Sequence, residues 1–195
     1  CPGTHDGQGL VSRAEKKAEA DEIQLFFMDE TTLTLHPVLR RCWMKRGQQR
    51  TVPAAGQQRH HHIFGAFNYV TQAVLWLDTT TKDTTSFLNF LEHLMSLVDL
   101  TKPVVLVLDN ASYHHSREAE AMLAFYEDDG LIACWLPPYC SDLNPIERFW
   151  LHLKGFACAN KLFASVSALL DSVRRCLLNQ NDLTGSNRFL FLNTS

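Results

Sequence analysis

The sequence predicts an α/β protein in which helices cover both faces of a mixed β-sheet. The first reason is the run Val104–Leu108 (VVLVL), which is unbroken, apolar and rich in β-branched residues. Such a run is typical of a strand that is buried on both faces. The second reason is the order of the elements, because strand-like runs come first and strands then alternate with helices. With 195 residues, the chain is long enough for one domain with a full core.

The first half of the chain contains most of the expected strands. They are Ile23–Asp29, Thr34–Trp43, His62–Tyr69 and Ala73–Leu77. Residues 1–12 are expected to form a loop, and Arg13–Glu22 a short helix or the end of a linker. We therefore assign residues 1–22 as an N-terminal linker or helix remnant, and residues 23–180 as the folded domain.

The second half of the chain alternates helices with strands. A helix with one apolar face is expected from the N-cap candidates Asp83–Thr85 to Val98. A second helix, Arg117–Tyr126, has Ser116 as its cap and Gly130 as its stop signal. The remaining elements are a strand over Leu131–Leu136, a helix from Pro145 and a helix over Val166–Leu178. Residues 181–195 are expected to be a tail, and its apolar patch, Phe189–Leu192, has no assigned place.

Charge is distributed unevenly along the chain. The formal net charge is −3, from 18 basic and 21 acidic residues. The segment Arg40–His62 contains six basic residues and no acidic one, so the rest has 12 basic against 21 acidic residues, a charge of −9. This segment is suited to phosphate backbones, with a solvated hairpin as the alternative. Its basic residues are Arg40, Arg41, Lys45, Arg46, Arg50 and Arg59.

Cysteine spacing and hydropathy indicate the compartment. The six cysteines have irregular spacing and no Cys/His pattern of a zinc site, which favours free thiols in a reducing environment. No apolar run approaches the roughly 18 residues of a membrane span, and the polar N-terminus lacks a signal-peptide core. We therefore expect an intracellular, cytoplasmic protein.

Three acidic residues stand at comparable places in the expected fold. Asp29 ends the first strand, Asp109 follows the buried strand, and Glu147 lies in the first turn of the helix that Pro145 opens. If the first and the buried strand are neighbours, Asp29 and Asp109 meet at their ends, and the helix can add Glu147. Converging carboxylates repel one another unless they are protonated or bind a metal, and their oxygens suit Mg²⁺ or Mn²⁺. Two such ions about 4 Å apart can activate a water or a 3′-hydroxyl against a phosphodiester.

Each acid also has a purely structural interpretation. Glu30 rather than Asp29 could be the acid that acts in the first strand. Asp109 could be a turn residue that hydrogen-bonds its own backbone. Glu147 could form a near capping box with Asn144 as N-cap.

Four segments resemble the catalytic domain of Tc/mariner-superfamily transposases, most closely the bacterial insertion-sequence branch. They are FFMDET, RCWMKRGQQ, VLVLDNASYHHS and LPPYCSDLNPIERFW, in this order. The resemblance covers about Ile23 to Leu178, and LPPYCSDLNPIE is its most specific motif. It implies an RNase H-like fold with a mixed five-stranded sheet and a DDE metal-binding triad of Asp29, Asp109 and Glu147. The third acid is Glu here, where mariner proper has Asp.

The resemblance also implies a reaction and its partners. These are cut-and-paste transposition of a DNA element with terminal inverted repeats, two Mg²⁺ or Mn²⁺ ions, and a homodimer that pairs the two ends. Family members recognise those ends with N-terminal helix-turn-helix modules, and residues 1–22 cannot form one, so we expect an isolated catalytic domain or a truncated copy. The alternatives are a nuclease of the same fold without strand transfer and a co-opted copy that binds DNA without catalysis.

Other residues near these motifs are candidates for supporting roles. Asn110 and His114 could orient the scissile phosphate or a metal-bound water, or His114 could instead pack beneath its loop. Asn144 could hold the loop ahead of Glu147. From the same helix, Arg148 and Lys154 could reach phosphates. The tract His60–His62 resembles a metal-binding sequence, but strand alternation would place His61 on the opposite face from its neighbours.

Overall fold

The computed structural model describes residues 4–35, 45–47, 60–137 and 144–182. The chain divides into two compact units, and each is described by itself. The first unit comprises Cys1–Thr31 with His62–Glu147, and the second comprises Thr32–His61 with Arg148–Ser195. All three acids singled out above belong to the first unit.

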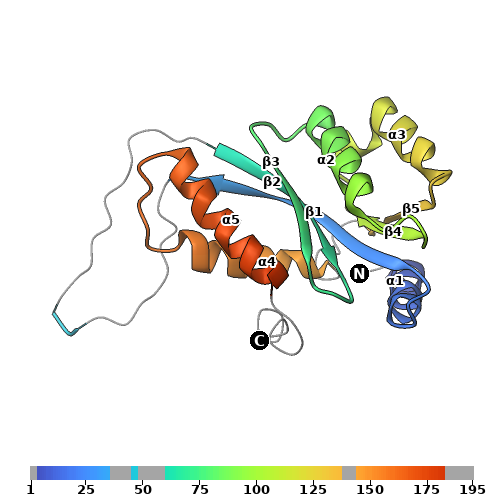
Figure 1. Ribbon diagram of the computed structural model, residues 1–195, viewed down its shortest axis with the longest axis horizontal. Helices are drawn as coiled ribbons and strands as arrows, with labels where there is room; N and C mark the ends of the chain where they lie inside the picture. Colours follow the sequence, from blue (N-terminus) through green and yellow to red (C-terminus); the bar gives the residue numbers. More distant parts are fainter. Residues whose placement is uncertain (1–3, 36–44, 48–59, 138–143, 183–195) are drawn as a thin grey trace. The chain divides into compact units, whose positions relative to one another are not determined.

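A single mixed sheet of five strands organises the fold (Figure 1). Its strands are β1 (Gln24–Thr34), β2 (His60–Asn68), β3 (Val74–Thr79), β4 (Val104–Leu108) and β5 (Leu131–Trp135). Their order across the sheet is β3-β2-β1-β4-β5. β4 runs parallel to both β1 and β5, whereas β2 and β3 are antiparallel. The predicted mixed, five-stranded sheet is therefore confirmed.

The strand β4 is buried over its whole length, as its sequence predicted. It pairs with β1 in a register that sets Phe27 opposite Val107. Asp29 and Asp109 each lie two residues beyond this pair. Because the two strands are parallel, these two aspartates reach the same edge of the sheet, where parallel sheets commonly build their sites.

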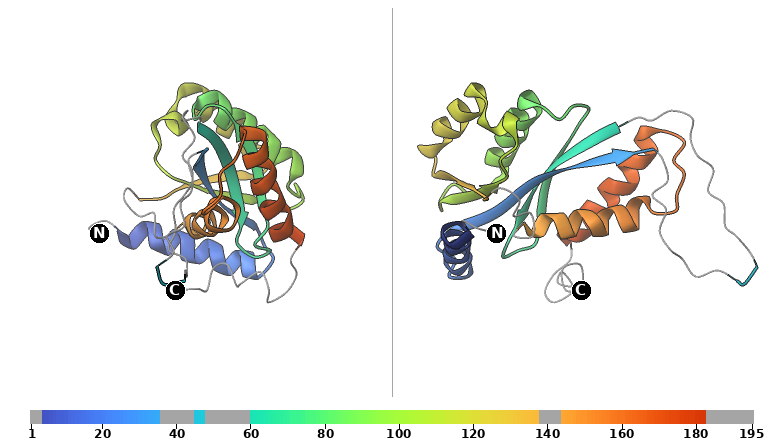
Figure 2. Two further views of the ribbon diagram at one scale, coloured as in Figure 1. Left: turned by 90° about the vertical axis from the view of Figure 1, so that its left-hand side faces the viewer. Right: turned by 180° about the vertical axis from the view of Figure 1, so that it is seen from behind.

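Helices cover both faces of the sheet within the first unit (Figures 1 and 2). They are α1 (Thr4–Glu19), α2 (Thr84–Leu97) and α3 (Arg117–Glu127). On one face, Phe26 and Met28 of β1 belong to the same buried cluster as apolar residues of α2 and α3. On the other face, Leu25 and Phe27 share a cluster with Val11 of α1. Of the helices that the structure describes, none is long and apolar enough to cross a membrane.

The loop expected over residues 1–12 is wrong, because α1 already begins at Thr4. The apolar periodicity of this helix is weak, because most of its residues are polar. Val11 and Ala18 are seven residues apart, which is two helical turns, and therefore lie on one face. Both side chains are buried against the sheet. Val11 and Ala18 therefore hold α1 against the sheet, although the polar sequence around them shows little helical pattern.

The boundaries of α3 follow the signals in its sequence. The Ser116 hydroxyl accepts a hydrogen bond from the Ala119 amide at 3.2 Å, as an N-cap does. After the helix, Gly130 has a φ of +86°, a left-handed conformation that residues with a Cβ rarely adopt. The Gly130 carbonyl then accepts a hydrogen bond from the Val104 amide at 2.9 Å. Gly130 therefore ends the helical segment and leads the chain into β5.

We expect Ser116→Ala to lower the free energy of unfolding by about 1 kcal/mol, because the Ala119 amide loses its cap. Urea unfolding followed by circular dichroism measures this change. Ser116→Asp is the matched control, since its carboxylate can accept the same hydrogen bond and is favoured at a helix N-terminus. Equal stability of the alanine variant and the wild type would contradict a capping role for Ser116.

The second unit contains most of α4 (Pro145–Leu153), the π-helical turn η3 (Lys154–Cys158) and α5 (Val166–Asp182). Of the apolar positions that its helical spacing predicted, α5 buries Leu169, Leu170, Val173 and Leu177, whereas Val166 is half-buried. The Ser172 hydroxyl donates to the Ala157 carbonyl at 2.9 Å and ties α5 to η3. Phe189–Leu192 lies outside the described residues. The predicted strand Thr34–Trp43 does not start as a separate strand, because Thr34 is the last residue of β1, and residues 36–43 are not described.

The cysteines that the structure describes, Cys134, Cys158 and Cys176, are free thiols. Burial raises the pKa of all three, and that of Cys158 to about 11. A thiol with a raised pKa is a poor nucleophile at neutral pH, because little thiolate is present. These cysteines therefore behave as small apolar core residues.

Candidate active site

Asp29 lies inside β1 and not at its end, which corrects the sequence-based placement. The strand continues through Glu30 to Thr34, because the β-branched residues that follow, Thr31, Thr32 and Thr34, favour an extended backbone. The position relative to Asp109 is nevertheless as predicted. Asp109 directly follows β4, and the parallel register carries Asp29 to the same level.

Asn144 connects the start of α4 to β1. Its side-chain amide donates to the Met28 carbonyl at 3.0 Å, one residue before Asp29. Its side-chain oxygen accepts from the Ile146 amide at 3.3 Å and so caps the helix. Asn144 is buried, while Glu147 in the first turn of α4 is exposed. The cap is thus made by Asn144, and the exposed Glu147 carboxylate is close enough to contribute to the raised pKa of Asp29.

The charges of Asp109 and Glu147 act on Asp29. Burial and the neighbouring Glu30 raise the pKa of Asp29 to about 7, and repulsion from Glu147 and Asp109 contributes to the same shift. Asp109 and Glu147, from distant parts of the sequence, are thus close enough for their charges to influence Asp29. A carboxylate in such surroundings is stabilised either by a proton or by a cation.

The donor set of these acids fits Mg²⁺ or Mn²⁺, which prefer hard oxygen ligands. Burial and repulsion between carboxylates raise the pKa of Asp29, and a divalent cation would offset both by stabilising the charged form. Among the described residues, no three His, Cys, Asp or Glu side chains are gathered closely enough to hold a metal ion as they stand. Coordination by the three acids therefore requires their side chains to close around the ion.

We expect Asp29→Asn to stabilise the metal-free protein by about 2 kcal/mol at pH 8. A carboxyl whose folded-state pKa exceeds its ordinary value of 3.8 weakens the fold as pH rises from that value to about 7. The destabilisation is absent near pH 3.5 and complete above pH 7, and asparagine removes it. Urea unfolding in EDTA at both pH values measures the effect. A variant less stable than the wild type at pH 8 would contradict this account.

Glu30 lies on the opposite face of β1 from Asp29, because successive side chains of a strand alternate. Its side chain is 1% exposed, and its two oxygens contact Lys82 Nζ at 3.0 Å and His114 Nε2 at 3.2 Å. Burial alone would raise the pKa of Glu30, but the hydrogen bond with His114 and the charges of His114 and Lys82 lower it. Of the two acids considered in the first strand, Asp29 is therefore the one whose pKa responds to Asp109 and Glu147.

His114 packs beneath its loop, which is one of the two roles considered for it. Its side chain is 1% exposed, and its ring lies 4.5 Å from that of Phe87 and 4.4 Å from that of Tyr113, between centroids. Nδ1 contacts Asp109 Oδ1 at 3.0 Å, while Nε2 contacts Glu30. Burial alone would lower the pKa of His114, but its hydrogen bonds to these carboxylates raise it to about 9. Direct contact with a DNA phosphate is excluded by this burial.

Asn110 fastens the loop after Asp109 to the end of β5. Its side-chain amide donates to the Leu136 carbonyl, and its side-chain oxygen contacts His115 Nε2 at 3.3 Å. Both ends of the amide are thus engaged with protein. Asn110 therefore shapes this loop, and its suggested role in orienting a phosphate stays a prediction.

Lys82 is a charged residue of the site that the sequence analysis missed. It precedes α2, its side chain is 38% exposed, and its Nζ lies 5.8 Å from the centroid of the Tyr113 ring. Burial would lower the pKa of Lys82, but Glu30, Asp29 and Asp109 together raise it. A lone lysine in a polar loop gives no sequence signal, because only the fold brings it to these acids.

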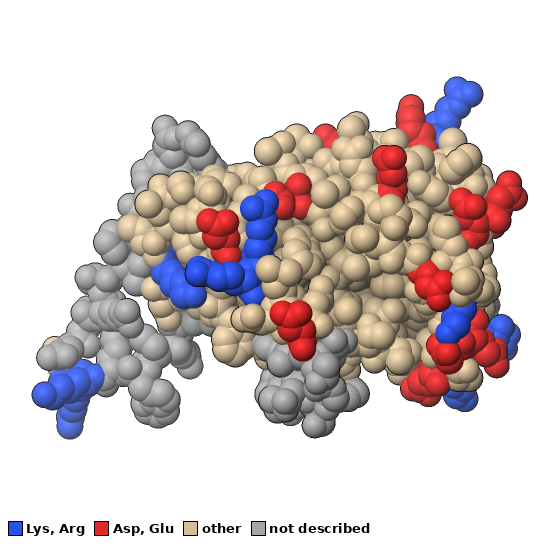
Figure 3. Space-filling view, viewed as in Figure 1, with Lys and Arg blue, Asp and Glu red and all other residues tan. Residues whose placement is uncertain are grey.

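The basic residues predicted to contact DNA are only partly described. Lys45 and Arg46 are exposed in a short turn, Arg148 is exposed on α4, and Lys154 is half-buried in η3. The other four, Arg40, Arg41, Arg50 and Arg59, lie outside the described residues. On the face drawn in Figure 3, the basic side chains of the described residues lie in small groups. In the histidine tract, His61 is buried and His60 is exposed, as alternation predicted.

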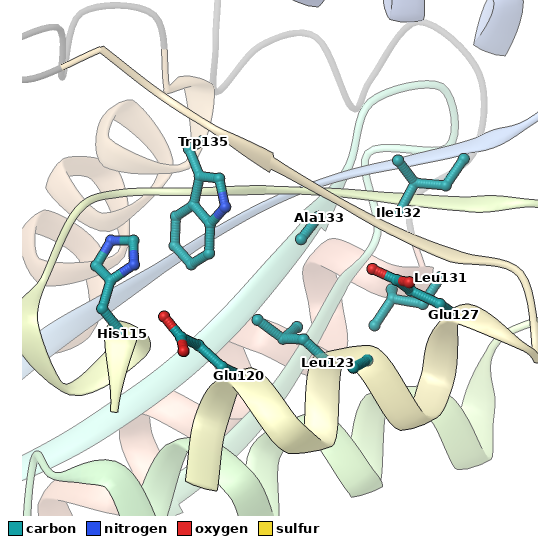
Figure 4. Close-up of a pocket in the computed structure, with 9 residues that line it drawn as sticks. His115, Glu120, Leu123, Glu127, Leu131, Ile132, Ala133 and Trp135 are labelled. Atoms are coloured by element: carbon teal, nitrogen blue, oxygen red, sulfur yellow. The ribbon is translucent and has the colours of Figure 1, made fainter. Parts of the chain in front are cut away.

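A groove of about 550 Å³ lies between α3 and β5 and contains none of the three acids (Figure 4). Glu120 and Glu127 of α3 line one side, and Ile132 of β5 lines the other. At one end, the rings of His115 and Trp135 stack with their centroids 4.3 Å apart. The groove carries no basic side chain along its lining apart from His115, so it does not suit a phosphate backbone.

Comparison with known proteins identifies the family of this chain. Residues 24–170 match the family model described as DDE superfamily endonuclease. The chain belongs to this family. The match covers the sheet, α2, α3, α4 and the beginning of α5, and hence all three acids. It confirms the family expected from the four sequence motifs.

Individual relatives of this DDE endonuclease domain agree with the family match. The chain is 28% identical over 173 residues to the insertion element IS630 uncharacterized 39 kDa protein of Shigella sonnei, covering 89% of this chain and 50% of that protein. The mariner Mos1 paired-end complex with Mg has a similar fold, with a TM-score of 0.68 and 16% identity. The match covers 96% of this chain and 56% of the Mos1 chain. The HTLV-2 integrase catalytic core domain in complex with magnesium also has a similar fold, with a TM-score of 0.53 and 14% identity. The match covers 82% of this chain and 87% of the integrase chain. The RNase H-like fold is thus confirmed, and the chain spans about half the length of its curated relative.

Proposed function

We propose that this chain is the catalytic domain of a transposase that cuts DNA at the ends of an insertion element and joins the freed 3′ ends to target DNA. The observation that carries the proposal is the parallel register that brings Asp29 and Asp109 to one edge of the sheet, where the charge of Glu147 also contributes to the raised pKa of Asp29. Membership of the DDE endonuclease family supports it. Similarity to an insertion-element protein and to the Mos1 transposase in a paired-end complex with a transposon end favours strand transfer over simple hydrolysis.

The three acids are proposed to hold two Mg²⁺ or Mn²⁺ ions. Bound divalent ions would supply Lewis acidity and a water activated at neutral pH. Magnesium is present in the Mos1 and HTLV-2 integrase structures that share this fold. With its pKa near 7, Asp29 loses its proton readily when a cation arrives.

The chain's own residues preorganise this site. Oδ1 of Asp109 accepts hydrogen bonds from the Ala111 amide at 3.0 Å and from His114, so the carboxylate is held in one orientation. Asn144 sets the first turn of α4, and with it Glu147, beside β1. Fixed acids reduce the reorganisation that the reaction needs.

DNA is the proposed partner, and a second copy of the chain is proposed to join it. Lys45, Arg46, Arg148 and Lys154, with the basic residues of the segment Arg40–His62, would contact the phosphate backbone. Two element ends must be brought together before strand transfer, which favours a pair of catalytic domains in the active complex.

Incubation of the chain with labelled duplexes that carry candidate inverted-repeat ends and a target plasmid, in Mn²⁺, tests this function. The proposal predicts cleaved ends and covalently joined products, both of which require the metal. Cleavage without joined products would indicate a nuclease of the same fold. DNA binding without any cleavage would favour a co-opted, non-catalytic copy.

A further inference from the structure

We propose that Glu30 is a positioning residue for the second acid of the site. Acting through His114, it would fix the Asp109 carboxylate so that one of its oxygens remains directed to a metal ion. This role rests on the proposed function, because it assigns a second layer of support to the same metal site.

The imidazole of His114 bridges two carboxylates with its two nitrogens. Nε2 lies 3.2 Å from Glu30 Oε1, and Nδ1 lies 3.0 Å from Asp109 Oδ1. The rings of Phe87 and Tyr113 flank it at 4.5 and 4.4 Å between centroids. A ring held at both nitrogens and packed against two aromatic rings has little freedom to turn. The position of Glu30 therefore determines where Nδ1 can donate.

The contacts of Asp109 fall on one of its two oxygens. Oδ1 accepts from the Ala111 amide at 3.0 Å and lies 3.0 Å from His114 Nδ1, which also contacts the Asp109 carbonyl oxygen at 3.3 Å. The side chain is 45% exposed, in contrast to the buried His114. These two contacts to Oδ1 orient the carboxylate plane and leave Oδ2 as the oxygen available for coordination. This is how hydrogen bonds in the layer behind metal ligands commonly tune a site.

Glu30 is itself held rigidly. Its side chain is 1% exposed, and Lys82 Nζ contacts its second oxygen at 3.0 Å. Strand alternation places Asp29 on one face of β1 and Glu30 on the other. Two consecutive residues of one strand therefore supply the first acid directly and support the second acid from behind.

Binding of Mn²⁺ to the purified chain, followed by electron paramagnetic resonance at fixed pH, tests this role. We expect Glu30→Ala to weaken the affinity for Mn²⁺ by about tenfold or more, the range seen when support behind a metal ligand is removed. Glu30→Gln should lose less, because its amide oxygen can still accept from His114 Nε2. Glu92→Gln is the charge-matched control on the exposed side of α2 and should bind as the wild type does. Leu94→Ala, in the core of α2, controls for lost stability.

A double variant separates positioning from a general structural effect. If Glu30 acts through His114, then Glu30→Gln combined with His114→Gln should weaken Mn²⁺ binding no more than His114→Gln alone. Two results would overturn the role of Glu30 while leaving the proposed function intact. One is a double variant whose loss of Mn²⁺ affinity equals the product of the two single losses, and the other is wild-type affinity in Glu30→Ala. A wild-type chain that binds no Mn²⁺ would overturn the proposed function itself, and this inference with it.

Discussion

Asp109→Asn should reduce metal-dependent strand cleavage by about 10³-fold or more, because metal ions contribute several kcal/mol to charge stabilisation in the transition state. Asparagine keeps an oxygen that can accept from the Ala111 amide and from His114, so the loop should retain its fold. It lacks the negative charge that a divalent cation requires. The loss should therefore appear in the rate of cleavage and in Mn²⁺ affinity, and not in DNA affinity without metal.

Single-turnover cleavage of an end-bearing duplex in Mn²⁺ measures this prediction. Asp99→Asn provides the control, since Asp99 hydrogen-bonds Thr101 in a turn between α2 and β4 and contacts none of the three acids. Its cleavage rate should equal that of the wild type. A rate for Asp109→Asn within tenfold of the wild type would remove Asp109 from the catalytic machinery.

His114→Ala should lower the free energy of unfolding by about 3 kcal/mol at pH 6, because removal of one partner of a buried ion pair leaves the other charge without compensation. The residue left behind is Glu30, whose side chain is 1% exposed. The flanking rings of Phe87 and Tyr113 would also lose a packing partner. Urea unfolding monitored by tryptophan fluorescence provides the measurement.

The cost of His114→Ala should depend on pH in a direction fixed by the pKa of His114. That pKa rises from its ordinary 6.5 to about 9 in the folded protein, so the stabilisation is fully present below pH 6.5 and lost as pH rises through 9. The pKa of Glu30 sets the acidic end of this pH range. Because the fold lowers that pKa, the stabilisation from the charged Glu30 is fully present above pH 4.5 and is lost as pH falls through the lowered pKa. The difference between wild type and variant should therefore be greatest at about pH 5 to 6.5.

Leu94→Ala supplies the reference for this pH series, because a core cavity carries no titratable group. Its cost in stability should be similar at pH 6 and pH 10. If the cost of His114→Ala were equally independent of pH, His114 would contribute only packing, and the charged bridge between Glu30 and Asp109 would be disproved.

Much of the sheet could be predicted from sequence because its strands carry strong local signals. The run Val104–Leu108 is apolar on both faces, and β4 lies between two parallel strands. Ser116 and Gly130 mark the ends of the segment that holds α3 through local backbone chemistry. Features that depend on distant packing were missed. α1 is stabilised by Val11 and Ala18 against the sheet, and nothing in its polar sequence indicates that contact.

The candidate site shows the same division between local and distant information. Asp109 and Glu147 follow a buried strand and open a helix, so local patterns place them. The separation of Asp29 from Glu30 could have been predicted, because the two alternate on one strand. The contact of Lys82 with Glu30 could not, since it joins a loop to a strand far away in the sequence. Contacts between residues far apart in the sequence depend on the topology of the fold, and no local pattern around Lys82 predicts its contact with Glu30.

Anomalous diffraction from crystals soaked in Mn²⁺ would test the central claim most directly, namely that Asp29, Asp109 and Glu147 form one metal site. The account predicts an anomalous peak among these three carboxylates, with the Asp109 oxygen that His114 does not contact among the ligands. A peak elsewhere, or carboxylates that stay apart in saturating Mn²⁺, would contradict it.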